Sequence, residues 1–352
     1  MSLRRHLPVS WTWRSVSETV GIPGTRLSQV KHTPLGVELT LQLVAPTTAS
    51  DIEAAADAVG VAYGVARVRV HRDPLRADRI ALSLDASTDI GRVALPPERN
   101  PVGLPLDVTR PFTLGLDDNG QVFRYQFTAR HVLIGGSPGS GKSNAMRVFL
   151  AYLAASRDVR LFGIDPKRVE LVLWRDRFSG LLVGHDVDGT ISLLEHLLDE
   201  VDHRTRALSK SGLASLPVGP DFPLVVLVVD EWAELAAMGD AKQRSLVASL
   251  LRRYVSLGRA VQCTSILCTQ RPTSDVIDVG TRALLHDRFA LKCGDRHQAD
   301  SILGLGSYNA TDLEAPQPGR ALWSDGRPAV PFQFYEVTDA AVPELVCAGF
   351  RI

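Results

Sequence analysis

The chain has 352 residues, enough for two domains or for one large α/β domain with an appendage, and 45% of them are hydrophobic, which is ordinary for a globular protein. Lys plus Arg and Asp plus Glu both number 39, so the chain as a whole is not basic and nucleic-acid binding would need a local basic surface. The longest apolar run, at 223–229, is too short to cross a bilayer. We therefore expect a soluble cytoplasmic protein that reaches a membrane only through a partner.

The cysteines are not spaced like a zinc site or a disulfide framework, since no two of them form a C-x-x-C pair. The sequence also contains no internal repeat and no low-complexity tract. We expect reduced, mostly buried thiols at Cys263, Cys268, Cys293 and Cys347.

Residues 1–95 have the pattern of a small α/β domain. Ser50 and Glu53 have the spacing of a capping box and open an Ala-rich stretch, which predicts a helix over 51–64. Alternation of apolar and polar residues predicts strands at 36–44, 65–72 and 79–85. The simplest packing of these elements is a β-α-β-β layer, and the Pro-rich stretch at 96–110 is expected to be a linker.

A second, larger domain is expected over 111–352, with a nucleotide-binding core at 131–336. It begins with a β-hairpin at 111–127, where Asn119-Gly120 separates two alternating apolar runs. From His131 on, strands and helices alternate, which predicts a doubly wound, mainly parallel sheet with helices on both faces. The expected strands lie at 131–135, 160–164, 224–229, 263–268, 286–291, near 319–323 and near 330–336, and the expected helices at 143–156, 189–209 and 240–257.

The stretch Gly135–Ser143 reads GGSPGSGKS and contains the G-x-x-x-x-G-K-S pattern of a phosphate-binding loop, between an apolar strand and a helix-compatible run. Backbone N–H groups of such a loop bind phosphates, Lys142 would reach the β- and γ-phosphates, and the Ser143 hydroxyl would bind Mg²⁺. Together with the predicted sheet, this indicates a P-loop NTPase of the RecA-like type that uses ATP and Mg²⁺. The alternative is a Gly-rich turn that binds nothing. The expected nucleotide-binding residues are Gly136, Ser137, Pro138, Gly139, Ser140, Gly141, Lys142, Ser143 and Asn144.

The apolar strand at 224–229 ends in Asp230 and Glu231, at the edge of the sheet where ligands bind in such folds. We assign Asp230 to Mg²⁺ and Glu231 to the attacking water, because one carboxylate can hold the metal and its hydration shell while the other orients or deprotonates water. A glutamate beside the metal aspartate favours hydrolysis over kinase activity, since nothing in the sequence suggests a phosphoryl acceptor site. The alternative is that both acids serve only the dipole of a helix N-terminus.

The next strand in order, at 263–268, is followed by Thr269 and Gln270. This position puts the Gln270 amide near the γ-phosphate. An amide can donate to phosphate and accept from water, so it suits a sensor that reports hydrolysis. The alternative is a polar residue that simply ends a strand.

These segments resemble the FtsK/SpoIIIE family of motor ATPases, within the broader group of hexameric HerA–FtsK pumps. The resemblance covers about Phe112 to the C-terminus, and residues 51–72 also look like the small domain that precedes the motor core in this family. It rests on GGSPGSGKS, IDPKRVEL, VVLVVDEWAEL, GRA with ILCTQRPTSDVI, and SILGLGSYNATDLEAPQPGRALW.

The resemblance implies a ring of six subunits that moves along double-stranded DNA by ATP hydrolysis. It places Lys142 and Ser143 in the phosphate loop, Asp230 and Glu231 at the metal and the water, and Gln270 in the sensor. Arg259 matches an arginine that acts on the neighbouring subunit's ATP, where a positive charge stabilises the γ-phosphoryl group; the alternative is an ordinary cation near a helix C-terminus. Basic residues that face the pore and contact DNA phosphates are matched by Arg271, Arg282 and Arg296. The alternative for each of these arginines is an ordinary solvated surface charge. A family signature with a largely structural role is matched by Asp165, Lys167 and Glu170.

The chain departs from the family's chromosome pumps, which carry membrane-spanning helices before the motor and a C-terminal winged-helix domain after it. The stretch between Pro166 and Pro223 is also shorter than expected. A reduced motor of this kind looks more like the plasmid and integrative-element transfer proteins of actinobacteria. The expected partners are then double-stranded DNA and further copies of the same chain. A membrane protein would recruit the motor to the inner face of the cell membrane. The alternatives are a type VII-like protein-secretion ATPase, which shares the motifs, and a nucleotide-dependent switch or scaffold that is not a motor.

Overall fold

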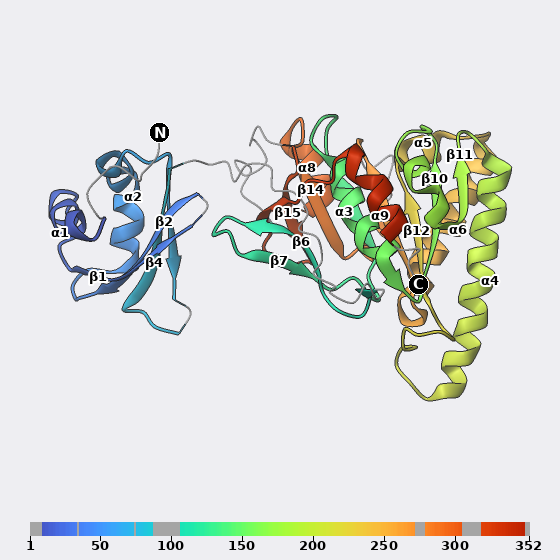
Figure 1. The fold of residues 1–352 in the computed structure, drawn as a ribbon, viewed down its shortest axis with the longest axis horizontal. Helices are drawn as coiled ribbons and strands as arrows, with labels where there is room; N and C mark the ends of the chain where they lie inside the picture. The colour runs from blue at the N-terminus through green and yellow to red at the C-terminus, as the bar shows by residue number, and fades with distance from the viewer. Residues whose placement is uncertain are drawn as a thin grey trace. The chain divides into compact units, whose positions relative to one another are not determined.

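The computed structural model describes residues 9–33, 35–73, 75–86, 106–271, 279–304 and 318–348. The chain forms two compact units, one made of Met1–Gly91 with Leu116–Gln121 and the other of Arg92–Gly115 with Val122–Ile352 (Figure 1). The expected linker at 96–110 falls mostly outside the described residues.

The first unit is an antiparallel sheet in the order β1-β2-β4-β3 with two helices. Alternate residues of β2 are buried, and they form one apolar core with side chains of both helices, including Trp13 and Ile52. The three strands expected here are confirmed, whereas the first helix and first strand were not predicted. The elements are α1 (Val9–Thr19), β1 (Thr25–His32), β2 (Gly36–Leu43), α2 (Ala49–Tyr63), β3 (Arg67–Arg72) and β4 (Arg79–Asp85).

The helix α2 begins two residues earlier than the sequence predicted, so the expected capping box at Ser50 and Glu53 is wrong. The capping residue is Thr48, whose backbone N–H donates to the Asp51 carboxylate at 2.7 Å while Asp51 N–H donates to the Thr48 hydroxyl at 3.4 Å. Two overlapping boxes with the same spacing occur in the sequence, and the chain uses the first because Thr48 has the extended backbone that a cap requires.

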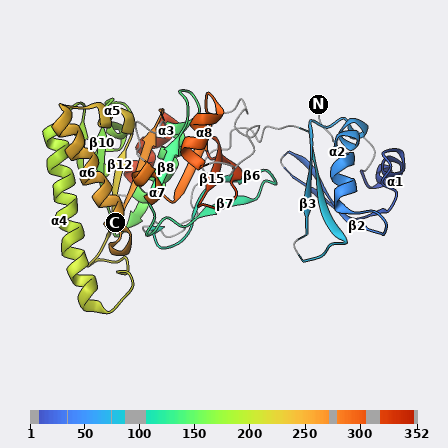
Figure 2. The ribbon, with the colours of Figure 1, turned by 180° about the vertical axis from the view of Figure 1, so that it is seen from behind.

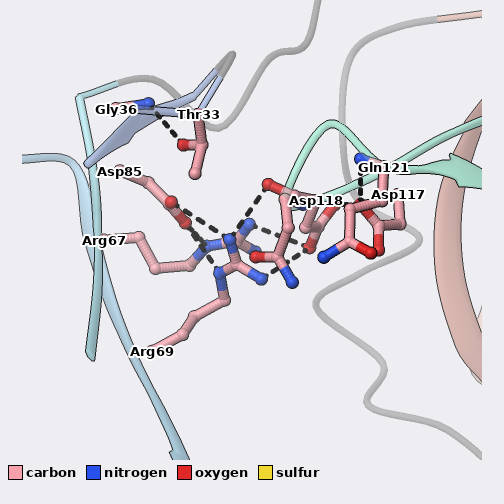
Figure 3. A network of polar contacts seen from close by, with 9 residues as sticks. Thr33, Gly36, Arg67, Arg69, Asp85, Asp117, Asp118 and Gln121 are labelled. Atoms are coloured by element: carbon pink, nitrogen blue, oxygen red, sulfur yellow. Dashed lines mark hydrogen bonds and ion pairs between the residues drawn. The ribbon is translucent and has the colours of Figure 1, made fainter. Parts of the chain in front are cut away.

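A buried carboxylate network lies on the other face of the first unit's sheet (Figure 3). Asp85 is fully buried and accepts hydrogen bonds from Arg69 at 2.8 and 3.1 Å and from Arg67 at 3.3 Å. The Arg67 guanidinium also lies 3.3 Å from the carboxylate of Asp118. Two arginines and two acids therefore share one site, which satisfies a charge that burial alone would make costly.

The second unit contains a ten-stranded sheet in the order β11-β10-β12-β13-β8-β14-β15-β16-β6-β7, counted over the described residues. The strands from β11 to β14 pair in parallel, whereas β14, β15 and β16 pair antiparallel. All the strands and helices expected in this domain are confirmed. The strands are β6 (Phe112–Asp117), β7 (Val122–Tyr125), β8 (Val132–Gly135), β10 (Val159–Asp165), β11 (Phe178–Val183), β12 (Leu224–Val229), β13 (Cys263–Thr269), β14 (Asp287–Leu291), β15 (Arg320–Ser324) and β16 (Val330–Phe334), and a separate pair comprises β5 (Leu106–Asp107) and β9 (Ser156–Arg157).

Helices cover both faces of this sheet, as a doubly wound fold requires (Figures 1 and 2). One face buries Val225, Leu227 and Val229 in a core shared with α4, α5, α6 and α8, while α3 packs with α9. The helices are α3 (Lys142–Ala155), α4 (Val187–Ser211), α5 (Trp232–Ala237), α6 (Ala241–Gly258), α7 (Val279–Leu284), α8 (Arg296–Leu303) and α9 (Val342–Ala348), and the 3₁₀ helices are η2 (Leu171–Arg177), η3 (Arg259–Val261) and η5 (Asp339–Ala341).

The predicted hairpin at 111–127 is confirmed as β6 and β7. Asp117 N–H donates to Gln121 O at 2.8 Å across the turn, and Gly120 has a φ of 71°, a left-handed conformation that glycine adopts without strain. The turn therefore depends on the Asn119-Gly120 pair from which it was predicted.

Burial of His131 makes the fold sensitive to acid. His131 is the residue immediately before β8, and its Nδ1 lies 3.0 Å from Ser265 Oγ. Burial of the ring, together with the nearby charges of Arg259 and His286, lowers the pKa of His131 from 6.5 to about 3. Between pH 6.5 and pH 3 the imidazole of His131 is therefore protonated in the unfolded chain and neutral in the folded chain.

We expect the free energy of unfolding to fall by up to about 1.4 kcal/mol per pH unit between pH 6.5 and pH 3 through this residue. The variant His131→Gln should flatten that part of the profile, whereas His203→Gln, at an exposed position of α4, should not. Urea denaturation at pH 8, 6 and 5 measures the effect, and identical profiles for wild type and His131→Gln would contradict it.

Candidate functional site

The predicted phosphate loop connects the central strand β8 to α3 (Figure 2). Gly139 and Gly141 have φ values of 77° and 95°, a region that L-residues with side chains rarely adopt. Lys142 is the first residue of α3, so the loop ends where unpaired helix N–H groups begin. The sequence pattern therefore has the local backbone that a phosphate loop needs.

Main-chain hydrogen bonds from three neighbouring segments hold the loop in place. Gly136 N–H donates to Thr269 O at 3.2 Å, and Ser137 N–H donates to Lys292 O at 2.8 Å. Gly319 N–H donates to Ser140 O at 2.8 Å. A Cβ on Gly141 would lie 2.3 Å from Gly319 N, so this glycine is needed for space as well as for backbone conformation.

Lys142 is buried against the end of β12. Its ammonium group donates to Asp230 O at 2.8 Å and to Asp230 Oδ1 at 3.2 Å, and the side chain is only 5% exposed. Burial raises the pKa of Asp230, and the Lys142 charge opposes that rise. For Lys142, burial lowers the pKa while Cys268 and Asp230 raise it, and the net result is a raised pKa. The ammonium group is therefore charged at neutral pH.

Glu231 is 1% exposed, and both of its carboxylate oxygens are engaged. The Gln270 backbone N–H lies 3.0 Å from Oε1 and 3.2 Å from Oε2, and the Lys167 ammonium donates to Oε2 at 3.0 Å. Three segments that are distant in sequence therefore meet at one carboxylate. They do so because β10, β12 and β13 are parallel neighbours whose carboxyl ends lie at the same edge of the sheet.

The structure thus brings together Lys142, Asp230, Glu231 and the backbone N–H of Gln270. The sensor role of the Gln270 side-chain amide stays a prediction. Lys167 was expected to have a largely structural role, and its contact with Glu231 was not predicted. The position of Lys167, two residues after the end of β10, could have indicated this contact. The strand β10 pairs in parallel with β12 from Val159 to Ile164, so residues that follow the two strands emerge close together. The other two signature residues make hydrogen bonds that connect local segments. Asp165 accepts a hydrogen bond from Leu171 N–H, and Glu170 accepts hydrogen bonds from Arg147.

Arg259 does not join this group. It caps the C-terminal end of α6, where β13 is about to begin, so it lies toward the opposite edge of the sheet from Gln270 and its side chain is exposed. Its assignment to a neighbouring subunit's ATP stays a prediction.

The three arginines predicted to contact DNA have different surroundings. Arg271 is exposed and lies two residues after the end of β13, and Arg296 is exposed at the first turn of α8, with Asp300 3.8 Å away. Arg282 is half-buried and donates to Ser301 O at 3.0 Å, a contact that ties α7 to α8. Arg271 and Arg296 are thus the better placed of the three to contact a ligand.

Two residues predicted to bind nucleotide or metal lie at the start of α3. Asn144 uses its side-chain amide on the backbone of the C-terminal segment, donating to Tyr335 O at 2.8 Å and accepting from Val337 N–H at 2.7 Å. Its backbone N–H remains the group that could bind phosphate. Ser143 precedes it and is half-buried.

The side chains at this edge fit Mg²⁺ bound together with a nucleotide. The Ser143 hydroxyl and the Asp230 carboxylate are hard oxygen ligands, and the buried Ser140 hydroxyl has no hydrogen-bond partner within the described residues. No group of three or more His, Cys, Asp or Glu in the described part of the chain forms a metal cage.

The fold and the phosphate loop define the class of the protein: it has an α/β fold of the P-loop NTPase type. Residues 98–221 match the model of the FtsK/SpoIIIE family, which confirms over this segment the resemblance predicted from the sequence.

Two curated relatives extend this likeness. Protein Tra of Streptomyces lividans is 26% identical over 337 residues, which cover 89% of this chain and 51% of the relative. DNA translocase FtsK 2 of Neisseria meningitidis is 31% identical over 231 residues, 56% of this chain and 22% of the relative. The chain thus spans about half the length of one relative and less than a quarter of the other.

Solved structures show the same fold. The pCW3 conjugation coupling protein TcpA, in its monomer form with ATPγS, superposes with a TM-score of 0.66 at 18% identity, over 96% of this chain and 98% of TcpA. EssC of Geobacillus thermodenitrificans superposes with a TM-score of 0.60 at 19% identity, over 73% of this chain and 50% of EssC. No helix among the described residues is long and apolar enough to cross a membrane.

The two left-handed glycines of the phosphate loop provide a matched test of its geometry. A Cβ on Gly139 meets nothing within 4 Å, whereas one on Gly141 meets the Gly319 backbone. We expect Gly139→Ala to lower the free energy of unfolding by about 1–2 kcal/mol through backbone strain alone, and Gly141→Ala by about 2–5 kcal/mol because overlap adds to strain. Urea denaturation of both variants compares them, and equal reductions would mean that the Gly319 contact is not tight.

Proposed function

We propose that this chain is an ATP-driven translocase of double-stranded DNA that acts as a homohexameric ring in plasmid or conjugative DNA transfer, or in DNA segregation. The observation that carries the ATPase part is the connected set of Lys142, Asp230, Glu231 and Gln270 at one edge of the sheet. Similarity to Protein Tra along 89% of the chain supports the transfer role.

Each side chain has a role in hydrolysis that its position supports. Lys142 would leave Asp230 for the β- and γ-phosphates of a bound ATP. Asp230 and Ser143 are the residues that would hold Mg²⁺, and the ion would supply positive charge to the phosphate oxygens. Glu231 orients the attacking water and takes its proton.

Gln270 couples this chemistry to the segment that follows β13. Its backbone N–H holds Glu231, so a change at the γ-phosphate that moves Glu231 also moves Gln270 and then Arg271. Arg271 and Arg296 contact DNA phosphates without reading bases. Arg259 completes the site of the next subunit, which explains why it lies away from its own.

The variant Lys142→Ala should abolish ATP hydrolysis, because it removes the charge that reaches the phosphates. In the wild type, saturating linear duplex DNA should raise the turnover rate more than single-stranded DNA does, and added salt should reduce the effect, since bound phosphates release counterions. Steady-state ATPase assays with duplex, single-stranded or no DNA at two salt concentrations measure this. An ATP turnover rate that is the same with and without duplex DNA would exclude the proposed DNA translocase function.

The variant Arg271→Ala should weaken stimulation by DNA while leaving turnover without DNA close to that of the wild type. Removing one arginine from a DNA phosphate should lower the slope of log affinity against log salt by about 1. Arg253→Ala is the matched control, since Arg253 is an exposed arginine of α6 that pairs with Asp202. Equal effects of the two variants on DNA stimulation would remove Arg271 from the DNA site.

The contact between Lys167 and Glu231 makes Lys167 a positioning residue. Lys167→Met keeps the length of the side chain but leaves Glu231 with the Gln270 N–H alone, so we expect kcat to fall about tenfold with little change in KM, as general-base steps contribute factors of roughly 10²–10⁴. Lys167→Arg should restore part of the rate because it restores the charge. A merely structural role would instead lower the unfolding free energy and leave kcat of the folded fraction unchanged.

A protein-secretion ATPase is the second candidate, because the fold superposes on EssC over 73% of this chain. It predicts that duplex DNA has no effect on turnover and that a helical secretion-substrate peptide binds in a pull-down. The ATPase assays with DNA therefore separate the two functions.

A further inference from the structure

The turn between α6 and β13, residues 259–262, carries the exposed side chain of Arg259 on a firmly held backbone. Gln262 N–H donates to Arg259 O at 3.3 Å, which closes the turn, and Val225 N–H donates to Gln262 O at 2.9 Å, which attaches the turn to β12. Gln262 has a φ of 58°, a left-handed conformation that a residue with a side chain seldom adopts. A backbone of this kind persists only where its surroundings hold it.

The loop that follows α4 supplies a second set of contacts to this turn. Leu216 N–H donates to Ala260 O at 2.9 Å, and Gln262 Nε2 donates to Leu216 O at 2.8 Å. Leu216 and Gln262 are both buried, so water does not compete for these bonds. The loop and the turn are therefore joined by a pair of hydrogen bonds at a single residue of the loop.

A buried arginine of α4 makes the third set of contacts. Arg204 is fully buried, and its Nη1 donates to Pro223 O at 2.7 Å and to Val261 O at 3.2 Å. Its Nε donates to the Glu200 carboxylate at 2.6 Å. Pro223 immediately precedes β12 and Val261 lies in the turn, so one guanidinium fixes the turn relative to the sheet.

Stability alone does not account for an arginine at this position. A guanidinium removed from water is costly unless its donors are satisfied, and Arg204 Nη2 has no hydrogen-bond partner within the described residues. Well-packed apolar replacements of buried charges are often neutral or stabilising, and Glu200, which is 30% exposed, would keep contact with water. The arginine therefore points to a functional reason for fixing the turn.

We infer that Arg204 is a positioning residue for Arg259, which it holds in place to act on ATP bound by a neighbouring copy of this chain. The inference rests on the proposed function, in which Arg259 completes the site of the next subunit. A side chain that acts across an interface must present its charge at a fixed point, because an error of about 1 Å can cost a factor of about 100 in rate. Arg204 itself touches no nucleotide in this role and acts through the Val261 carbonyl.

Mixtures of two inactive variants separate the subunit that supplies Arg259 from the subunit that hydrolyses ATP. Lys142→Ala supplies Arg259 but lacks the lysine that reaches the phosphates. Arg259→Ala has a complete phosphate loop but supplies no arginine. We expect each variant alone to be nearly inactive and an equimolar mixture to regain ATP turnover, because some sites then combine an intact loop with an intact arginine from the neighbour.

The subunit that carries a further substitution then tests Arg204. Arg204→Met in the Lys142→Ala subunit should lower the regained turnover about fivefold or more, because the arginine that crosses the interface is no longer held. The same substitution in the Arg259→Ala subunit should leave turnover within about twofold, since that subunit supplies no arginine. Arg204→Lys should restore part of the rate because it keeps a charged donor. Arg206→Met, at an exposed arginine of the same helix, is the control and should have no effect in either subunit.

Equal losses in the two subunits would mean that Arg204 only supports the fold, and no loss in either would mean that the turn holds without it; both results overturn the inference. If the mixture with native Arg204 regains no turnover, the role of Arg259 is wrong and the inference falls with it, while ATP hydrolysis by the wild type would still support the ATPase. If Arg204→Met does not fold, Gln262→Met replaces it. That variant removes the amide bond to Leu216 O, and we expect the same difference between the two subunits.

Discussion

Two acids buried at the end of one strand impose the constraint around which the second unit is organised. Asp230 and Glu231 are nearly inaccessible to solvent, and a buried charge costs several kcal/mol unless other groups compensate it. The compensation comes from Lys142, Lys167 and the Gln270 N–H, which belong to three separate segments. Those segments must therefore converge on the end of β12 for the fold to be stable.

Parallel pairing supplies that convergence. The strands β10, β12, β13 and β8 are hydrogen-bonded neighbours that run in one direction, so the residues that follow each of them emerge at one edge. The phosphate loop follows β8 there, and its backbone is bonded to the ends of β13 and β14 through Thr269 O and Lys292 O. The same register that buries the apolar strands thus assembles the polar site.

The sequence predicts this part of the structure well because the physical signals are local. Continuous apolar runs mark the buried strands, and the spacing of Gly136, Gly141, Lys142 and Ser143 identifies the loop. The strand β11 was missed because its residues are mostly half-buried and show no clear alternation. The partners of Asn144 and Lys167 were missed because they depend on the path of irregular segments, which no periodicity encodes.

The main-chain bonds of the phosphate loop also bear on how hydrolysis would drive movement. Arg271 and Arg296, the two exposed arginines proposed to contact DNA, lie after β13 and β14, the two strands whose ends hold the loop. A loop that tightens on ATP and relaxes on ADP would therefore pull on both arginine-bearing segments through one hydrogen bond each. Both of these bonds lie at the edge of the sheet where the strands end. The proposed motor thus places its force-bearing contacts outside the packing that keeps the domain folded.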